Sequence, residues 1–228
     1  MQYPKHVLTL TILLTVLAAV SVAQNWDATR DFGASNPNGA WSYGWGVTGT
    51  SFTLYTIYHA KDCFPVSGFI CWSADVYPYH QPLVGFNTTG QWIYTLTNLI
   101  TPDALFLGPS PDWQPGDSIV EWTAPTTATY RISGFFEILD TNPTGIVGLV
   151  YRNGTLLFRV ELLVPGAQYP NQIGGRANFY FPNVSLNAGD VISFGLNSDG
   201  TFYYDGTGFN ATIVTPPNAP ACANCSQH

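Results

Sequence analysis

Aromatic side chains gather in one irregular, proline-containing stretch, and their types suit the binding of sugars. The faces of Trp and Tyr rings can stack on the C–H faces of sugar rings, while nearby polar groups bond the hydroxyls. Aromatic rings exposed on loops are costly unless they bind something, so this stretch indicates a glycan-binding surface. The same rings could instead plug one end of a sandwich or cover one of its faces. The candidate residues are Trp72, Tyr77, Tyr79, Trp92, Tyr94 and Trp113.

Oxygen ligands for a hard cation cluster in a second segment. Asn197 and Asp199 lie in the run Asn-Ser-Asp-Gly-Thr, and Asp205 follows shortly after it. Calcium prefers carboxylate and carbonyl oxygens, and extracellular calcium is concentrated enough for weak sites. The spacing does not match an EF-hand loop, and the pattern favours an ordinary Asp-Gly turn over a calcium site. We therefore expect no required cofactor, with a structural calcium ion at these three residues as the alternative.

Catalytic signatures are sparse in this chain. The three glutamates fall on the polar sides of predicted strands, whereas a glycosidase needs two carboxylates facing each other across a cleft. The aspartates lie mostly in turns, where they bond local backbone groups. The histidines are too few and too scattered for a catalytic triad or a zinc site. The sequence therefore favours a protein that is not an enzyme; a hydrolase would need aspartates from distant loops to converge.

Four cysteines indicate structural disulfides in an oxidising compartment. Cys63 and Cys71 enclose seven residues, among them Pro65 and Gly68, which can reverse the chain, so we expect these two to pair. Cys222 and Cys225 have the spacing of redox proteins but lie in a proline-rich tail. This tail lacks the strand-to-helix context that activates a thiol, which favours a small structural disulfide. The rival pairings would join the first pair of cysteines to the second.

The first 23 residues have the pattern of a signal peptide. Lys5 and His6 precede an apolar run over residues 7–20, and Ser21-Val22-Ala23 supplies small residues before a cleavage site at Gln24. A membrane span needs about 20 apolar residues, so a retained anchor is the weaker alternative. The net charge of −7 becomes −8 once Lys5 is removed. We expect a secreted, acidic protein that binds neither nucleic acid nor, after cleavage, a membrane.

Composition and periodicity predict an all-β protein. Only 9% of residues are charged while 15% are aromatic, and short segments alternate between apolar and polar residues. The pattern predicts a two-sheet antiparallel β-sandwich of the jelly-roll type, as one domain over residues 24–215, followed by a tail over residues 216–228. The clearest strands are expected at residues 41–45, 52–59, 118–124, 129–138, 145–163 (a hairpin), 178–181, 191–196 and 209–214.

Several core faces follow from the same alternation. Trp41, Tyr43 and Trp45 share one face of a strand, while the small residues Ser42, Gly44 and Gly46 leave the other face open to a neighbouring segment. In the hairpin, Asn153-Gly154 suits a type I′ turn. Its second strand is expected to direct four residues into the core: Leu156, Phe158, Val160 and Leu162.

The opening of the mature chain resembles a group of secreted bacterial proteins, many of which carry a PEP-CTERM sorting tail. The motifs are Trp26-Asp27, Asp31-Phe32, Asn36-Pro37-Asn38-Gly39 and the run from Trp41 to Trp45. This chain lacks the Pro-Glu-Pro motif, the terminal helix and the arginine cluster, so the resemblance does not imply sorting to the cell surface. Residues 128–212 are also similar in pattern to complement-type and TNF-like jelly rolls. The group has no established activity, so the resemblance implies only fold and export.

Three functional hypotheses follow from these observations. The leading one is a non-enzymatic secreted sandwich that binds a glycan or cell-surface polymer through loop aromatics. The second is a structural or self-associating extracellular protein, and the third is a hydrolase acting on glycosides or polymers. Five N-glycosylation sequons occur, at Asn87, Asn153, Asn183, Asn210 and Asn224. Whether they are used depends on the source organism, which the sequence leaves open, as it does the oligomeric state.

Overall fold

The computed structural model describes residues 23–61, 63, 66–76, 80–111, 116–162 and 175–216. These residues form strands and turns, and no helix among them is long and apolar enough to cross a membrane. Several predictions fall outside the described residues. They are the expected signal peptide up to residue 22, the aromatic residues Tyr77, Tyr79 and Trp113, and the cysteines Cys222 and Cys225.

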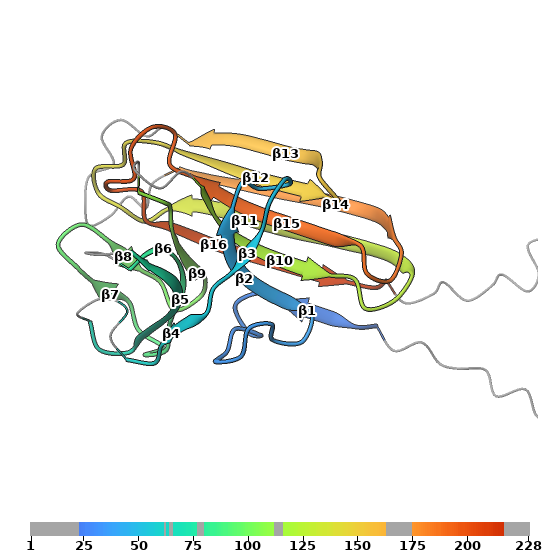
Figure 1. Cartoon of the computed structure of the whole chain (residues 1–228), viewed down its shortest axis with the longest axis horizontal. Helices are drawn as coiled ribbons and strands as arrows, with labels where there is room; N and C mark the ends of the chain where they lie inside the picture. The colour runs from blue at the N-terminus through green and yellow to red at the C-terminus, as the bar shows by residue number, and fades with distance from the viewer. Residues whose placement is uncertain are drawn as a thin grey trace, which may run out of the picture.

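The strands form two main antiparallel sheets that face each other (Figure 1). One has the order β14-β11-β16-β9-β6-β5-β4, with β1 paired to β16, and the other has the order β13-β12-β15-β10-β2-β3. β7 and β8 pair with each other alone. The strand bounds are β1 (Asn25–Asp27), β2 (Trp41–Gly46), β3 (Thr53–Leu54), β4 (Ile57–His59), β5 (Phe69–Val76), β6 (Gln81–Asn87), β7 (Ile93–Tyr94), β8 (Leu99–Ile100), β9 (Leu105–Gly108), β10 (Asp117–Thr123), β11 (Ala128–Ile138), β12 (Ile146–Arg152), β13 (Thr155–Leu162), β14 (Arg176–Leu186), β15 (Val191–Asn197) and β16 (Thr207–Val214).

The last eight strands form a jelly roll. β9, β16, β11 and β14 lie side by side in one sheet, and β10, β15, β12 and β13 lie side by side in the other. This order, in which the chain crosses repeatedly between the sheets, is that of a jelly roll. The predicted all-β sandwich is confirmed. Earlier strands widen both sheets, with β6, β5 and β4 extending the first and β2 and β3 extending the second.

Aromatic rings join the two sheets at the centre of the sandwich. Phe136, Phe179 and Phe209 come from β11, β14 and β16 and contact one another through Phe136, and the last two also contact Phe194 of β15 in the opposite sheet. The ring centroids are 5.7 Å apart for Phe179 and Phe194 and 5.2 Å apart for Phe194 and Phe209. Burying each such ring contributes about 1.5–3 kcal/mol, so these contacts dominate the packing between the sheets.

The glycines of β2 allow a close approach, as the sequence predicts. Trp41 and Tyr43 are fully buried on one face of the strand, and Trp45 is partly buried. On the other face, a β-carbon at Gly44 would collide with the carbonyl oxygen of Thr53 in β3. The edge strand β3 can therefore pair closely with β2 because Gly44 has no side chain.

The hairpin formed by β12 and β13 is confirmed; of its four predicted core residues, three are partly buried against the core and one is exposed. Asn153 and Gly154 both have positive φ angles, of 46° and 80°, as a type I′ turn requires. Phe158 and Val160 pack against the core. Leu156 is 47% exposed, because the pairing shifts register between Val150 and Tyr151. A β-bulge of this kind moves the following side chains to the other face.

The stretch that looked irregular in sequence contains three strands of the larger sheet. β6 and β9 are buried along most of their length, and β9 is buried throughout. A strand covered on both faces has no reason to alternate apolar and polar residues, so periodicity does not reveal it. The strand expected at residues 52–59 is also divided. β3 pairs in one sheet and β4 in the other, because the chain crosses between the sheets near the buried Tyr55.

The predicted disulfide is present between Cys63 and Cys71, whose Cα atoms are 5.6 Å apart. Both cysteines are fully buried in a second apolar cluster that contains Phe69 and Phe106. Val66, inside the disulfide loop, packs against the same cluster. The disulfide therefore fixes the segment that precedes β5 onto the central strands of the larger sheet.

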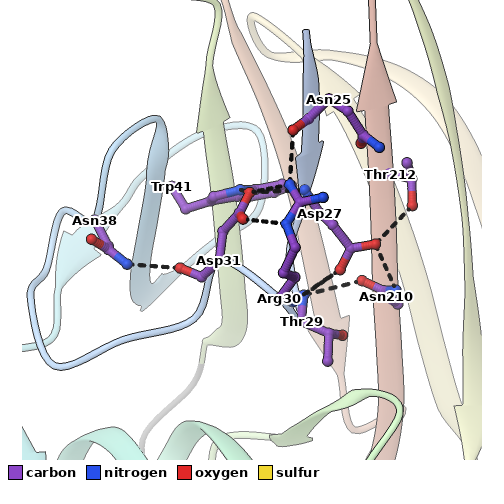
Figure 2. A network of polar contacts seen from close by, with 9 residues as sticks. All are labelled: Asn25, Asp27, Thr29, Arg30, Asp31, Asn38, Trp41, Asn210 and Thr212. Atoms are coloured by element: carbon purple, nitrogen blue, oxygen red, sulfur yellow. Dashed lines mark hydrogen bonds and ion pairs between the residues drawn. The ribbon is translucent and has the colours of Figure 1, made fainter.

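The carboxylate of Asp27 holds the opening segment against β16 (Figure 2). Four donors converge on it at 3.0–3.4 Å: the backbone N–H groups of Thr29 and Arg30 and the side chains of Asn210 and Thr212. These bonds join residues nearly 200 positions apart in the sequence. They satisfy polar groups that would otherwise lose their partners where β1 ends.

A second carboxylate, that of Asp31, completes this network (Figure 2). The Arg30 guanidinium donates to it at 2.8 Å and the Trp41 indole N–H donates at 3.3 Å. Burial acts to raise the pKa of Asp31, but these donors and the backbone N–H of Asp27 lower it below its ordinary value. The segment from Asn25 to Asp31 is therefore a structural clasp that joins β1 and the turn after it to β2 and β16.

Replacing Asp27 should destabilise the whole domain. We expect Asp27→Ala to lower the free energy of unfolding by about 1–3 kcal/mol, because four donors lose one shared acceptor. Urea denaturation measures the change. Asp103→Ala removes an exposed carboxylate and serves as the matched control. Equal stability of the two variants would show that the clasp does not stabilise the fold.

Candidate functional site

A pocket of about 450 Å³ opens at the end of the sandwich that carries β7 and β8, at the left in Figure 1. Its size lies in the range of small-molecule binding sites. Three connections build the wall: the turn between β7 and β8, the β11–β12 connection and the β15–β16 connection. Phe106 of β9 and Val66 of the disulfide loop also line it. The pocket therefore lies on the buried cluster that contains the disulfide.

Backbone hydrogen bonds join these three connections. The N–H of Thr141 donates to the carbonyl of Thr97 at 2.9 Å, and the N–H of Leu99 donates to the carbonyl of Leu139 at the same distance. The N–H of Leu139 donates to the carbonyl of Gly206 at 2.8 Å. The wall is thus a hydrogen-bonded extension of the sandwich, which keeps its side chains in fixed positions.

Three consecutive aromatic residues form one side of the pocket. Phe202 is buried, whereas Tyr203 and Tyr204 are 48% and 46% exposed. The centroids of the rings of Phe202 and Tyr203 are 4.3 Å apart. Tyr204 has a φ of 65°, a conformation that costs a residue with a β-carbon about 1–3 kcal/mol. Such strained residues concentrate at binding sites, and here the strain sets the direction of an exposed ring.

Asp205, the next residue, fastens this aromatic run to the β11–β12 connection. Its carboxylate accepts hydrogen bonds from the Thr144 backbone N–H at 3.0 Å, the Thr144 hydroxyl at 2.9 Å and the Gly145 N–H at 3.2 Å. The residue is 1% exposed. Burial, together with a smaller effect of the negative charge of Asp140, raises its pKa to about 7, although the hydrogen bonds act in the opposite direction.

Asp140 is the second buried carboxylate of the pocket. It accepts hydrogen bonds from the backbone N–H groups of Thr141 at 2.7 Å and Asn142 at 3.4 Å. Burial raises its pKa to about 6, although these bonds act in the opposite direction. Two further acceptors line the pocket without a hydrogen-bond donor. They are the side-chain carbonyl oxygens of Gln81 and Asn98, both of which are buried.

The structure separates the aromatic residues that the sequence singled out. Trp72 is 7% exposed and belongs to the main core, and its indole N–H donates to the carbonyl of Gly33 at 2.9 Å. The exposed position predicted for Trp72 is therefore wrong, because β5 is paired on both sides, with β4 and β6, and the Trp72 ring packs into the main core. Trp92 and Tyr94 are 39% and 63% exposed, and they lie at and beside β7, next to the turn that lines the pocket.

Sequence reasoning missed Tyr203 and Tyr204 as residues that line the pocket. Their signal was present: three adjacent aromatic residues between glycines cannot all face one core, since neighbouring side chains of an extended chain point in opposite directions. The alternation of apolar and polar residues in the flanking strands carries no information about the connection between them. Asp205 was singled out as a calcium ligand rather than as the residue that positions these rings.

The three residues predicted to bind calcium have different partners. The Asn197 amide donates to Asp117 at 2.8 Å, and its oxygen accepts the backbone N–H of Asp199 at 3.0 Å. Asp205 bonds Thr144 and Gly145, as described above. Among the described residues, no group of three or more His, Cys, Asp or Glu residues is arranged to hold a metal ion. Calcium binding here stays a prediction.

No family model and no curated protein matches the chain. Among solved structures, it is similar to an adhesin domain of Lys-gingipain from Porphyromonas gingivalis, at 14% identity over 51% of this chain and 75% of that chain, with a TM-score of 0.36. It is also similar to the CBM36-1 domain of a multidomain xylanase from the hindgut metagenome of Trinervitermes trinervoides (13% identity, 57% and 92% coverage, TM-score 0.32). A third is a family 35 carbohydrate binding module from Clostridium thermocellum (16% identity, 44% and 72% coverage, TM-score 0.29). Likeness at this level assigns neither a ligand nor an activity to this chain.

The raised pKa of Asp205 predicts a specific dependence of stability on pH. The carboxyl ionises near pH 3.8 in the unfolded chain and near pH 7 in the folded protein, so the folded state binds more protons between these values. Its contribution to stability therefore falls as the pH rises from about 4 to about 7. Asp205→Asn keeps the shape and removes the charge.

We expect the stability of Asp205→Asn relative to the unmodified protein to increase between pH 5 and pH 8, by on the order of 2 kcal/mol. Chemical denaturation at the two pH values measures this difference, in which the titration of groups that do not interact with Asp205 cancels. Asp103→Asn is the control for the loss of one exposed charge. A stability difference that is the same at both pH values would contradict the prediction.

Proposed function

We propose that this protein is a secreted, non-enzymatic β-sandwich that binds a glycan, as a free chain or as part of a cell-surface polymer, in the end pocket. The observation that carries the proposal is the wall formed by Tyr203 and Tyr204. These two half-exposed rings stand over a pocket that also contains buried polar acceptors. Sugars are recognised by this combination, since they present apolar C–H faces and hydroxyl donors on one ring.

The rigid setting of the pocket supports binding of a defined ligand. Its three connections are joined by backbone hydrogen bonds, and the Asp205 carboxylate fixes the aromatic run. A wall that is ordered before the ligand arrives loses less conformational freedom on binding, which improves affinity. The exposed Trp92 and Tyr94, near the same opening, could extend the contact to further sugar units.

Export is supported by the buried disulfide and by the expected signal peptide over residues 1–23. Disulfides form and persist in oxidising compartments, and a pair that is fully buried has a structural role. The acidic composition is unsuited to anionic partners such as nucleic acids. A secreted protein of this charge meets its polymer ligands outside the cell.

Binding without hydrolysis is favoured by the state of the two aspartates. Asp140 and Asp205 do converge on the pocket, as a hydrolase would require. However, both carboxylates accept hydrogen bonds from the β11–β12 connection, and Asp205 uses both of its oxygens in this way. A catalytic carboxyl must reach the glycosidic oxygen, so these groups are better suited to holding the pocket wall.

Truncation of the two tyrosines tests the proposal. A glycan array identifies ligands, and calorimetry then gives the dissociation constant for the best oligosaccharide. We expect Tyr203→Ala and Tyr204→Ala each to weaken binding about 5- to 30-fold, since an aromatic face contributes about 1–2 kcal/mol. The control is Tyr180→Ala, which removes a tyrosine that is 61% exposed on β14, outside the pocket.

Two results would contradict the proposal. One is a folded protein that retains no glycan on the array, and the other is undiminished binding by both pocket variants. Mass spectrometry of the oligosaccharide after incubation separates binding from hydrolysis, because shortened products would identify a hydrolase. Light scattering of the free protein tests the self-associating alternative, for which a defined oligomer is expected.

A further inference from the structure

The hydroxyl of Thr144 lies among three oxygen atoms of the aromatic run that forms one side of the end pocket. It is 3.1 Å from the carbonyl oxygen of Thr201, 3.0 Å from that of Tyr203 and 2.9 Å from Oδ2 of Asp205. A hydroxyl carries one hydrogen, so it donates to only one of these acceptors at a time. One donor on the β11–β12 connection is therefore shared by three acceptors on the β15–β16 connection.

The two oxygens of the Asp205 carboxyl group have different surroundings. Oδ1 accepts the backbone N–H groups of Thr144 at 3.0 Å and Gly145 at 3.2 Å, whereas Oδ2 lies against the Thr144 hydroxyl. A proton on Oδ1 would face two N–H hydrogens, so the neutral carboxyl group carries its proton on Oδ2. Because Asp205 is 1% exposed, this O–H group donates to the Thr144 hydroxyl oxygen rather than to bulk water.

The charge of Asp205 decides where the Thr144 hydroxyl donates. A hydrogen bond to a charged acceptor is roughly twice as strong as one to a neutral acceptor, so the ionised carboxylate draws the hydroxyl hydrogen to Oδ2. When the carboxyl group is neutral, it donates to the hydroxyl oxygen instead. The hydroxyl hydrogen then bonds a backbone carbonyl, that of Tyr203 or Thr201. The neutral state thus connects the carboxyl group to the aromatic run through two successive hydrogen bonds.

The positions that Thr144 contacts lie on both sides of Tyr204. The carbonyl of Tyr203 precedes this residue and the carboxyl group of Asp205 follows it. Tyr204 has a φ of 65°, and such a conformation persists only where the surrounding structure holds it. Loss of the contact to the Tyr203 carbonyl therefore relaxes the segment that sets the direction of the two half-exposed rings.

We propose that Thr144 is the positioning residue of the sugar-binding wall and that a proton on Asp205 controls it: with the proton, the hydroxyl holds the tyrosine rings in the arrangement that binds glycan, and without it the hydroxyl turns to the carboxylate. This inference rests on the proposed function and adds regulation of the same site by pH. Burial raises the pKa of Asp205 to about 7, so affinity is highest below this pH and falls as the pH rises through it.

The other titratable groups of the pocket lining are Asp140 and the two exposed tyrosines. The negative charge of Asp140 contributes to the raised pKa of Asp205, and its own pKa, about 6, is lower. Among the ion pairs of the described residues, none includes either aspartate. His80 does not line the pocket, and its ring lies 4.5 Å from that of His59.

The first test measures glycan affinity against pH. The probe is the oligosaccharide that the glycan array ranks first, and calorimetry from about pH 5.5 to about pH 8.5 gives its dissociation constant. We expect affinity to fall about two- to fivefold over this range, the effect of one neutral hydrogen bond, with a midpoint near the Asp205 pKa of about 7.

Reciprocity gives a second measurement on the same residue. If the protonated state binds glycan more tightly, bound glycan must raise the pKa of Asp205 by the logarithm of the same ratio, about 0.3–0.7. The ¹³C NMR signal of the Asp205 carboxyl carbon reports this titration directly, with and without the oligosaccharide. An unchanged midpoint in the presence of saturating oligosaccharide would contradict the coupling.

Three variants connect the pH dependence to the pair of side chains. Asp205→Asn imitates the neutral carboxyl group, because its amide N–H donates to Thr144 while its oxygen accepts the two backbone N–H groups; we expect tight binding at every pH. Thr144→Val keeps the shape and removes the hydroxyl, so binding should be weak at every pH. Thr144→Ser restores the hydroxyl and should restore the dependence on pH. Urea denaturation shows whether each variant is folded.

Asp140→Asn separates the two aspartates. It removes a negative charge that raises the pKa of Asp205, so the fall in affinity should persist with its midpoint at a lower pH. If the fall disappears in this variant, titration of Asp140 is its cause and the inference is overturned. If Thr144→Val does not fold, Asp205→Asn decides, because a pH dependence that persists in it also overturns the inference.

The failure of this inference differs from the failure of the proposed function. If the tyrosine variants weaken glycan binding but the affinity of the unmodified protein is the same at every pH, the protein binds glycans and the regulation is wrong. If the folded protein retains no glycan at any pH, both proposals are overturned. Constant tight binding by Asp205→Asn and constant weak binding by Thr144→Val support both.

Discussion

Packing of aromatic rings between the two sheets is the interaction on which the rest of this structure depends. Phe194 of β15 meets Phe179 and Phe209 of the opposite sheet, and all three rings are buried. Because β11, β14 and β16 share these contacts, their positions relative to β15 are fixed. The connections that leave β11 and β15 must then meet at one end of the sandwich, and there they build the pocket. The rigidity of the pocket therefore depends on the packing of the core.

Where several strands end, aspartate carboxylates accept hydrogen bonds from backbone N–H groups. Asp27 accepts two N–H groups near β1, Asp117 accepts the Thr48 N–H at 2.9 Å, and Asp205 accepts two at the β11–β12 connection. A chain with so few charged residues uses its aspartates mainly as hydrogen-bond acceptors and only secondarily in ion pairs. A carboxylate offers two strongly accepting oxygens, so one side chain can order several residues of a turn.

Sequence reasoning succeeded where one face of a strand is buried and the other is not. On β11, apolar residues recur at every second position from Tyr130 to Ile138, and the large ones among them are fully buried. It failed for β6 and β9, which are buried on both faces and carry no alternation, and at Leu156, where a bulge reverses the face. The disulfide was predictable because a short loop leaves few geometries. The pocket was not, since it depends on contacts among connections more than 40 residues apart in the sequence.

The clasp and the pocket both use aspartate carboxylates as hydrogen-bond acceptors, but they differ in how the negative charge of the carboxylates is balanced. In the clasp, Asp31 lies beside the Arg30 guanidinium, at 2.8 Å, so its negative charge is neutralised within the fold. In the pocket, the negative charge of Asp140 adds to the cost of ionising Asp205, and Tyr204 adds a strained backbone angle. Stability alone would favour an arginine or a neutral side chain at such a position, because buried unpaired charge is costly. Strain, unpaired charge and donor-less acceptors concentrated around one opening are therefore better explained by what enters the pocket than by what holds the sandwich together.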